Sequence, residues 1–124
     1  MENDQLTPQI TFRNLPQEEK KLKLERMLLK SPNKIPIIFE KHERSRLNCN
    51  KADIKFLSDE NIKLGFFIEQ VRTILTLEKN EALYFSCSEE IVLSPDIIIG
   101  DLYKKYREED GYLYIQFTEL ASFG

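Results

Sequence analysis

The side chains that most often carry out catalysis are sparse in this chain. Its only histidine is His42, and its 2 cysteines are Cys49 and Cys87. A thiol nucleophile needs a neighbouring base, and a zinc site needs several cysteine and histidine ligands. The sequence has no Cys-x-x-Cys pair and no second histidine. We therefore expect these three residues to be structural or incidental, and we expect no metal or cofactor site.

Carboxylates and glycines offer no clearer route to an enzyme. Glu108, Glu109 and Asp110 are consecutive, and two carboxylates can act as a general acid and a general base. Consecutive acidic residues at a turn, however, are expected to be solvated. The 4 glycines are scattered and form no phosphate-binding loop. The sequence therefore predicts a protein that is not an enzyme.

Composition narrows the class of protein further. A chain of 124 residues with 41% hydrophobic and 31% charged residues is typical of one globular domain with its own core. A net charge of −3 argues against a nucleic-acid binder, although basic residues gather at 20–30 and acidic ones at 108–110. We see neither a secretory signal nor an apolar run of roughly 20 residues. The default expectation is a cytosolic protein with reduced cysteines.

The N-terminal third is predicted to contain one helix. Residues 1–14 are polar and weakly patterned, so we expect them to be flexible or loosely packed. A helix is predicted over 15–31, because Pro16 suits a first turn and Pro32 disfavours helix in the residue before it. One apolar stripe of this helix can pack on the body, and the other is left for a neighbouring segment or a partner. The stripes are Leu24, Met27 and Leu28, and, roughly opposite, Leu22 and Leu29.

The remaining elements follow the order of a β-grasp. A strong helical stripe covers residues 60–75, with Asp59 or Asn61 as the expected cap, and a short helix is expected over 99–106. We therefore predict an α+β fold, a ubiquitin-like β-grasp at 32–117, preceded by the helical extension and followed by a flexible tail at 118–124. The expected strands, marked by alternating apolar residues, are 35–40, 54–57, 82–87, 91–93 and 112–117.

Several short motifs, in order over roughly a hundred residues, carry a resemblance to a known family. They are PNKIPIIFE at 32–40, KFL at 55–57, DLY at 101–103, EDGYLY at 109–114 and FG at 123–124. Each motif alone is weakly specific. Together they resemble the autophagy ubiquitin-like modifiers, the family of GABA-A-receptor-associated protein and microtubule-associated protein light chain 3.

The resemblance implies a modifier that is attached through its terminal glycine to phosphatidylethanolamine on autophagosomal membranes. For this chain it implies conjugation at Gly124, with Phe123 recognised as part of the tail. Glycine suits a tail that threads a narrow enzyme channel, because it has no Cβ to obstruct passage. The implied partners are an activating enzyme, a conjugating enzyme, a processing or deconjugating cysteine protease, and the phosphatidylethanolamine membrane. The implied location is cytoplasmic, and the autophagosome membrane when the chain is lipidated.

The resemblance also implies a groove for receptor peptides of the form aromatic-x-x-aliphatic. The free edge of the second strand would pair with the peptide backbone, a common use of an exposed edge. Matching positions imply two pockets beside this edge. The aromatic pocket would be lined by Lys23, Met27, Pro36, Ile38, Lys55, Leu57 and Tyr112, and the aliphatic pocket would be bordered by Phe56, Ile62, Phe67 and Gln70.

This sequence departs from the family pattern at several positions. Asp53 stands where a basic residue usually holds the acidic flank of the peptide, and Gln70 replaces an aliphatic residue. The second pocket is therefore predicted to be more polar than usual. The other departures are Ser31 for an aromatic residue, Ser58-Asp59 for an apolar-Pro pair, and Ile74 for an arginine.

Alternatives remain open at this point. The chain could be a modifier attached to a protein lysine, or a β-grasp docking module that is never conjugated. Phe56, Leu57 and Tyr112 could be ordinary packing residues. The basic run at 20–30 could meet anionic lipid or acidic peptide flanks, or could simply be a solvated helix face.

Overall fold

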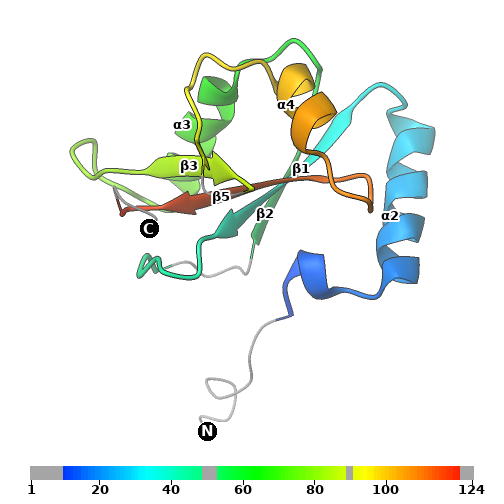
Figure 1. Cartoon of the computed structure of the whole chain (residues 1–124), viewed down its shortest axis with the longest axis horizontal. Helices are drawn as coiled ribbons and strands as arrows, with labels where there is room; N and C mark the ends of the chain where they lie inside the picture. The colour runs from blue at the N-terminus through cyan, green and yellow to red at the C-terminus, as the bar shows by residue number, and fades with distance from the viewer. Residues whose placement is uncertain (1–9, 49–52, 89–90, 121–124) are drawn as a thin grey trace, which may run out of the picture.

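The computed structural model describes residues 10–48, 53–88 and 91–120 as an α+β fold (Figure 1). Its strands form one five-stranded sheet in the order β2-β1-β5-β3-β4. The elements are η1 (Phe12–Asn14), α2 (Gln17–Lys30), β1 (Ile35–Lys41), β2 (Asp53–Ser58), α3 (Leu64–Ile74), β3 (Tyr84–Cys87), β4 (Ile91–Val92), α4 (Ile99–Tyr106) and β5 (Leu113–Thr118).

The centre of the sheet joins the first strand to the last. β1 and β5 run parallel, with Ile37 opposite Leu113, whereas β2 pairs antiparallel with β1 on the other side. β3 pairs antiparallel with both β5 and β4. Strands β2 and β4 are therefore the two edges. This is the β-grasp arrangement that the sequence predicts, with a hairpin, a crossing helix and a last strand returned to the middle.

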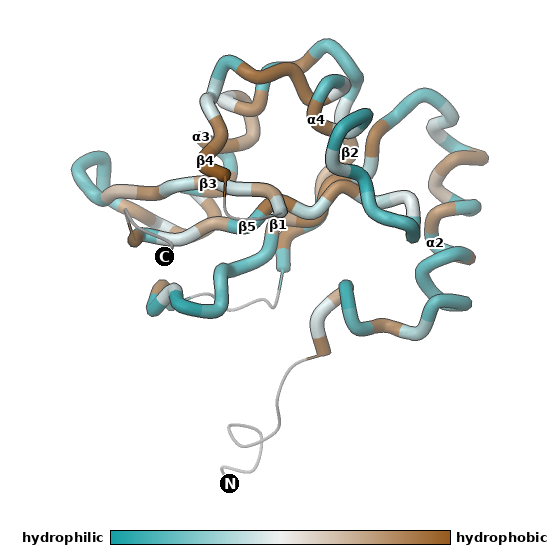
Figure 2. Tube along the Cα trace, in the orientation of Figure 1, coloured by the Kyte–Doolittle hydropathy of each residue, from teal (hydrophilic) through white to brown (hydrophobic). Residues whose placement is uncertain are grey.

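Helices α3 and α4 cover one face of the sheet (Figure 1). Alternate residues of the central strands point at them, because successive side chains of a strand face opposite sides. Figure 2 shows hydrophobic stretches interspersed with paler and hydrophilic ones along the strands, and a hydrophobic stretch leading into α4. The core on this face includes Ile37, Phe39, Leu64, Phe67, Val71, Leu102, Leu113, Ile115 and Phe117, all buried.

Elements η1 and α2 pack on the opposite face, against a second and smaller cluster. Phe12, Ile38, Tyr112 and Tyr114 are buried there, and Leu24 of α2 is partly buried against them. Hydrophilic and hydrophobic residues alternate along α2 (Figure 2), and Leu29 remains 85% exposed. Leu24 and Met27 of one predicted stripe thus face the body, but Leu28 of the same stripe is 38% exposed. The opposite stripe, Leu22 and Leu29, is open. Among the described residues, no helix is long and apolar enough to cross a membrane.

Two local expectations are wrong. The predicted cap of the long helix, Asp59 or Asn61, does not form, since α3 begins at Leu64 without a side-chain cap. The backbone before it is engaged elsewhere: the carbonyls of residues 60 and 62 accept the amides of Gly100 and Ile99 at 2.9 and 2.8 Å. Residues 12–14 are also not loosely packed, because Phe12 is only 5% exposed.

Candidate functional site

A cavity of about 300 Å³ lies between α2 and the hairpin formed by β1 and β2. All seven residues predicted for the aromatic pocket line it. Arg26, Ile37 and Phe56 line it as well, and of these Phe56 was expected to border the other pocket. The complete lining is Lys23, Arg26, Met27, Pro36, Ile37, Ile38, Lys55, Phe56, Leu57 and Tyr112.

The cavity walls follow from the periods of the helix and the strands. Lys23 and Met27 are four residues apart, so they share one face of α2. Across the hairpin, Pro36 lies opposite Leu57 and Ile38 lies opposite Lys55. Residues opposite one another on antiparallel strands present their side chains to the same face of the sheet. One face of the hairpin therefore supplies apolar surface next to a lysine.

The rim of the cavity is cationic, and one strand beside it has an open edge. Lys23, Arg26 and Lys55 all line the cavity, and the Lys55 ammonium lies 5.0 Å from the centre of the Phe12 ring. Leu57 is 44% exposed. No described strand pairs with the outer side of β2, which leaves its backbone donors and acceptors available. The site can therefore take an apolar or aromatic side chain from a segment that runs along β2.

The four residues of the predicted aliphatic pocket are divided between the hydrophobic core and two separate hollows. Phe67 is 3% exposed, and Phe56 and Ile62 pack partly buried against the same core. The Phe56 and Phe67 rings contact each other with centroids 5.1 Å apart. Gln70 lines a separate hollow of about 300 Å³ on the outer side of α3, together with Glu69, Thr73 and Ile74. The second pocket stays a prediction.

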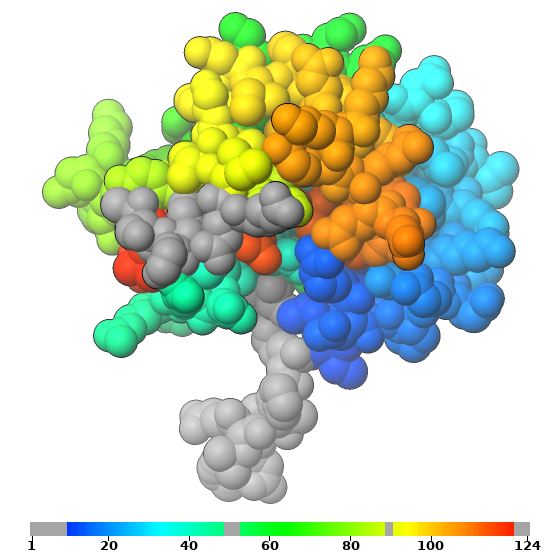
Figure 3. All heavy atoms as spheres, viewed as in Figure 1, coloured from blue at the N-terminus to red at the C-terminus, as the bar shows by residue number. Residues whose placement is uncertain are grey.

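Residues far apart in the sequence meet where α2 approaches the loop before β5 (Figure 3, blue against orange). The Lys20 ammonium lies 3.1 Å from the Asp110 carboxylate, and the two side chains are only 6% and 8% exposed. Asp110 also accepts hydrogen bonds from the Tyr114 hydroxyl and from the Tyr112 amide. The expectation that Asp110 is solvated is therefore wrong, because its turn folds back onto the sheet.

The environment of Asp110 favours its charged form. Burial raises the pKa of Asp110, but the hydrogen bonds from Tyr114, the Tyr112 amide and Lys20 outweigh burial, so the pKa lies below its usual value. Burial, followed by the Asp110 charge, raises the pKa of Tyr112 to about 12. The turn itself needs Gly111, whose φ is +88° and whose absent Cβ would lie 2.7 Å from a Leu24 methyl group.

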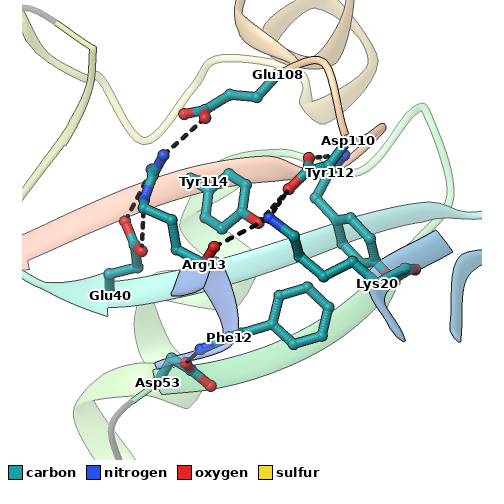
Figure 4. Close-up of polar contacts among 9 residues, drawn as sticks. All are labelled: Phe12, Arg13, Lys20, Glu40, Asp53, Glu108, Asp110, Tyr112 and Tyr114. Atoms are coloured by element: carbon teal, nitrogen blue, oxygen red, sulfur yellow. Dashed lines mark hydrogen bonds and ion pairs between the residues drawn. The ribbon is translucent and has the colours of Figure 1, made fainter. Parts of the chain in front are cut away.

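Element η1 is tied down by two acidic partners on the sheet and one on the turn (Figure 4). Arg13 donates to both oxygens of Glu40, at 3.0 and 3.1 Å, and to Glu108 at 2.7 Å. The Phe12 amide donates to the Asp53 carboxylate at 2.6 Å. The Phe12 ring meets Tyr112 edge-on at 4.7 Å, so η1 contacts a residue of the cavity lining. Arg13 lies outside the basic run at 20–30, so no pattern in the sequence signalled its contacts.

The imidazole of His42 and the thiol of Cys87 are both buried. His42 is 4% exposed, and its Nδ1 accepts the Arg44 amide at 3.1 Å. Cys87 is buried, and burial, with a smaller contribution from Glu108, raises the pKa of its thiol to about 12. Cys49 lies outside the described residues. Within the described ranges, no group of three or more histidine, cysteine, aspartate and glutamate side chains is placed to hold a metal ion.

The first residues of the predicted tail, 118 and 119, are held against the body. Thr118 belongs to β5 and is fully buried, so it is not part of a flexible leash. The Glu119 carboxylate accepts hydrogen bonds from the Ser45 hydroxyl at 2.7 Å and from the Arg46 amide at 3.0 Å. These contacts hold the chain to the loop after β1. The predicted conjugation residues, Gly124 and Phe123, lie outside the described residues.

Comparisons with known proteins agree with this geometry. A family model described as "Autophagy protein Atg8 ubiquitin like" matches residues 19–124. Autophagy-related protein 8 of Emericella nidulans is 30% identical over 110 residues, which cover 88% of this chain and 91% of that protein. Human microtubule-associated protein 1 light chain 3 gamma is 27% identical over 95 residues, 77% of this chain but only 65% of that relative.

A solved structure shows the same fold. The crystal structure of Trypanosoma brucei ATG8 superimposes with a TM-score of 0.77 at 27% identity, covering 95% of this chain and all of that one. The likeness includes the helical extension, since the coverage exceeds the β-grasp alone. With the family model spanning most of the sequence, the chain belongs to the Atg8 family of autophagy ubiquitin-like proteins.

Proposed function

We propose that this chain is an autophagy modifier that is joined through Gly124 to phosphatidylethanolamine and recruits receptors with aromatic-x-x-aliphatic motifs. The observation that carries the proposal is the cavity between α2 and the β1–β2 hairpin, beside the open edge of β2. Before conjugation the protein is cytoplasmic, and afterwards it resides on the autophagosome membrane.

Peptide recognition combines an added strand with one anchoring side chain. An extended peptide donates and accepts backbone hydrogen bonds along β2, which gives affinity without sequence preference. Its aromatic residue enters the cavity, where Pro36, Ile38 and Leu57 provide apolar contacts. The volume of about 300 Å³ is at the small end of ligand pockets and suits one side chain. The aliphatic residue three positions later then lies near the end of β2, towards α3.

Conjugation requires an activated terminal carboxylate. An activating enzyme adenylates the Gly124 carboxylate with ATP, releasing pyrophosphate, and its cysteine thiol then displaces AMP to form a thioester. A cysteine thiol of the conjugating enzyme takes over the acyl group, releasing the first thiol. The amine of phosphatidylethanolamine then attacks the thioester carbonyl, so that an amide bond forms and the enzyme thiol leaves. A processing or deconjugating cysteine protease would act on the same carbonyl. This chain supplies the carboxylate, while the catalytic thiols belong to the enzymes.

The proposal is tested by separating the two halves of the function. We expect deletion of Gly124 to abolish the lipid adduct, detected by mass after incubation with both enzymes, ATP and phosphatidylethanolamine liposomes, without changing peptide affinity. We expect Leu57→Asp to weaken an aromatic-x-x-aliphatic peptide by more than about tenfold in fluorescence anisotropy while leaving conjugation intact, because a buried unpaired charge is unfavourable. Leu29→Asp is the matched control, since Leu29 is exposed on α2 outside the cavity lining.

Other outcomes would identify a different function. An adduct that contains a protein lysine in place of the lipid would show a protein-attached modifier. Peptide binding with no thioester on the activating enzyme from the same organism would indicate an unconjugated docking module. If Leu57→Asp and Leu29→Asp bind peptide equally well, the cavity is not the recognition site.

A further inference from the structure

Asp53 is the first residue of β2, and its side chain lies on the face of the sheet that carries η1. Its carboxylate accepts the Phe12 amide at 2.6 Å (Figure 4), and the Lys55 ammonium sits over the Phe12 ring. Both side chains therefore contact the same residue of η1. Two positions apart on a strand, Asp53 and Lys55 share one face of the sheet. The edge that would receive a peptide thus alternates in charge.

In the described part of the chain, the charge of Asp53 has no ion-pair partner. Among the described residues, no ammonium or guanidinium group lies within ion-pair distance of it; its one hydrogen-bond partner is a neutral amide. The acidic residue just beyond the other end of β2 differs. Asp59 is 2.7 Å from the Lys34 ammonium, so its charge is already paired. The negative charge at the N-terminal end of the edge strand therefore lacks the lysine partner that Asp59 has at the other end.

The direction of a bound peptide follows from the proposed function, on which this inference rests. With the aromatic residue in the cavity and the aliphatic residue towards α3, the peptide runs parallel to β2. Residues before the aromatic one then extend towards Asp53. Because side chains alternate along a strand, the residue two positions before the aromatic residue faces the same side as Asp53.

We propose that Asp53 is a specificity-determining residue that disfavours a carboxylate two positions before the aromatic residue of the peptide and favours a basic one. The cationic rim formed by Lys23, Arg26 and Lys55 attracts acidic peptides in general. Asp53 counteracts that attraction at one position and thereby sets the position at which acidic charge is accepted. The backbone contact to Phe12 holds the carboxylate in place for this role.

The test compares three labelled peptides that differ at a single residue. Each has a tryptophan and, three residues later, a leucine, with glutamate, serine or lysine two positions before the tryptophan. We expect the wild-type protein to bind the lysine peptide most tightly and the glutamate peptide most weakly. Asp53→Asn, which can still accept the Phe12 amide, should improve binding of the glutamate peptide about fivefold and leave the serine peptide unchanged.

Two controls isolate the charge of Asp53. Asp59→Asn removes the same charge at the other end of the strand and should change none of the three affinities by more than about twofold, since Lys34 already pairs with Asp59. Amide hydrogen exchange of Phe12 in Asp53→Asn checks that η1 remains seated. The fivefold gain should also shrink at high salt, because exposed charges are screened.

Each contrary result is distinguishable. An unchanged penalty for the glutamate peptide in Asp53→Asn would overturn the role of Asp53 while leaving the groove intact. An equal effect of Asp59→Asn would show a general charge effect and would also overturn it. Sensitivity to acidic residues after the leucine, in place of those before the tryptophan, would refute the peptide direction. If no peptide binds in a Leu57-dependent manner, the proposed groove fails and this inference fails with it.

Discussion

The face of the sheet beneath α3 and α4 is closed by apolar side chains, whereas the face beneath η1 and α2 is closed by tyrosines and a charged network. Burial of apolar surface is non-directional and depends little on pH or salt. The second face depends on the protonation of Asp110 and on the positions of Lys20 and Arg13. The cavity between α2 and the β1–β2 hairpin borders this second face. Its walls therefore belong to the part of the molecule whose stability depends on pH and salt.

Among the four predictions, Phe39→Ala on the apolar face should lower the free energy of unfolding the most. Phe39 is fully buried and its ring contacts those of Phe56, Phe67 and Phe85. We expect a loss of about 4 kcal/mol in the free energy of unfolding, measured in urea, because a large cavity replaces the ring. The loss should be the same at pH 7 and pH 4.5. Phe66→Ala, at an exposed ring of the same type, should lose less than about 1 kcal/mol.

On the face covered by η1 and α2, Lys20→Met should cause the next largest loss in the free energy of unfolding. The variant leaves the Asp110 carboxylate buried without its ammonium partner. Breaking a buried ion pair in this way is expected to lower the free energy of unfolding by about 3 kcal/mol. Adding Asp110→Asn to Lys20→Met should cost less than Asp110→Asn alone does in the wild-type background. Additive losses in this double-mutant cycle would show that the two charges are not coupled.

Acid should weaken the charged face selectively. The pKa of Asp110 is lower in the folded state than in the unfolded chain. Its stabilising contribution is therefore fully present above the unfolded pKa of about 4 and is lost as the pH falls through the folded pKa. We expect the free energy of unfolding of Asp110→Asn to fall less steeply than that of the wild type below pH 4. Parallel curves from urea unfolding at several pH values would contradict this.

Arg13→Ala should have the smallest effect of the four. Arg13 is 38% exposed, so its contacts with Glu40 and Glu108 are partly screened by solvent. We expect a loss of at most about 1 kcal/mol that diminishes in high salt. The clearer effect should be local: the Phe12 amide should exchange its hydrogen faster than in the wild type. Arg107→Ala, whose guanidinium lies over the Tyr103 ring, should leave that amide protected.

The apolar face could be predicted from the sequence because its signals are periodic. Alternation in 35–40 and 112–117 and the helical stripe from Leu64 to Leu75 identified the core side chains directly. The short helix at 99–106 has the predicted bounds. The fold class followed from the order of these elements. The seven residues of the aromatic pocket came instead from the resemblance, and the structure brings them together in one cavity.

The charged face could not be predicted in the same way. Lys20 and Asp110 are 90 residues apart, and nothing in either local pattern pairs them. Phe12 has only Ile10 and Leu15 as nearby apolar residues, too few for a periodic pattern to mark it as buried. The second pocket stays a prediction: Phe67 is buried on the core stripe of α3, and Gln70 lines a separate hollow. Single side chains that act over long sequence distances leave no local signal.

The parallel pairing of β1 with β5 has a consequence for synthesis of the chain. Residues 35–41 can find their central partner only after residues 113–118 have left the ribosome. Until then the hairpin of β1 and β2 exposes two edges and most of its apolar surface. Long-range pairing of this kind slows folding and prolongs exposure of aggregation-prone strands. We therefore expect the nascent hairpin to be a segment that molecular chaperones bind during translation.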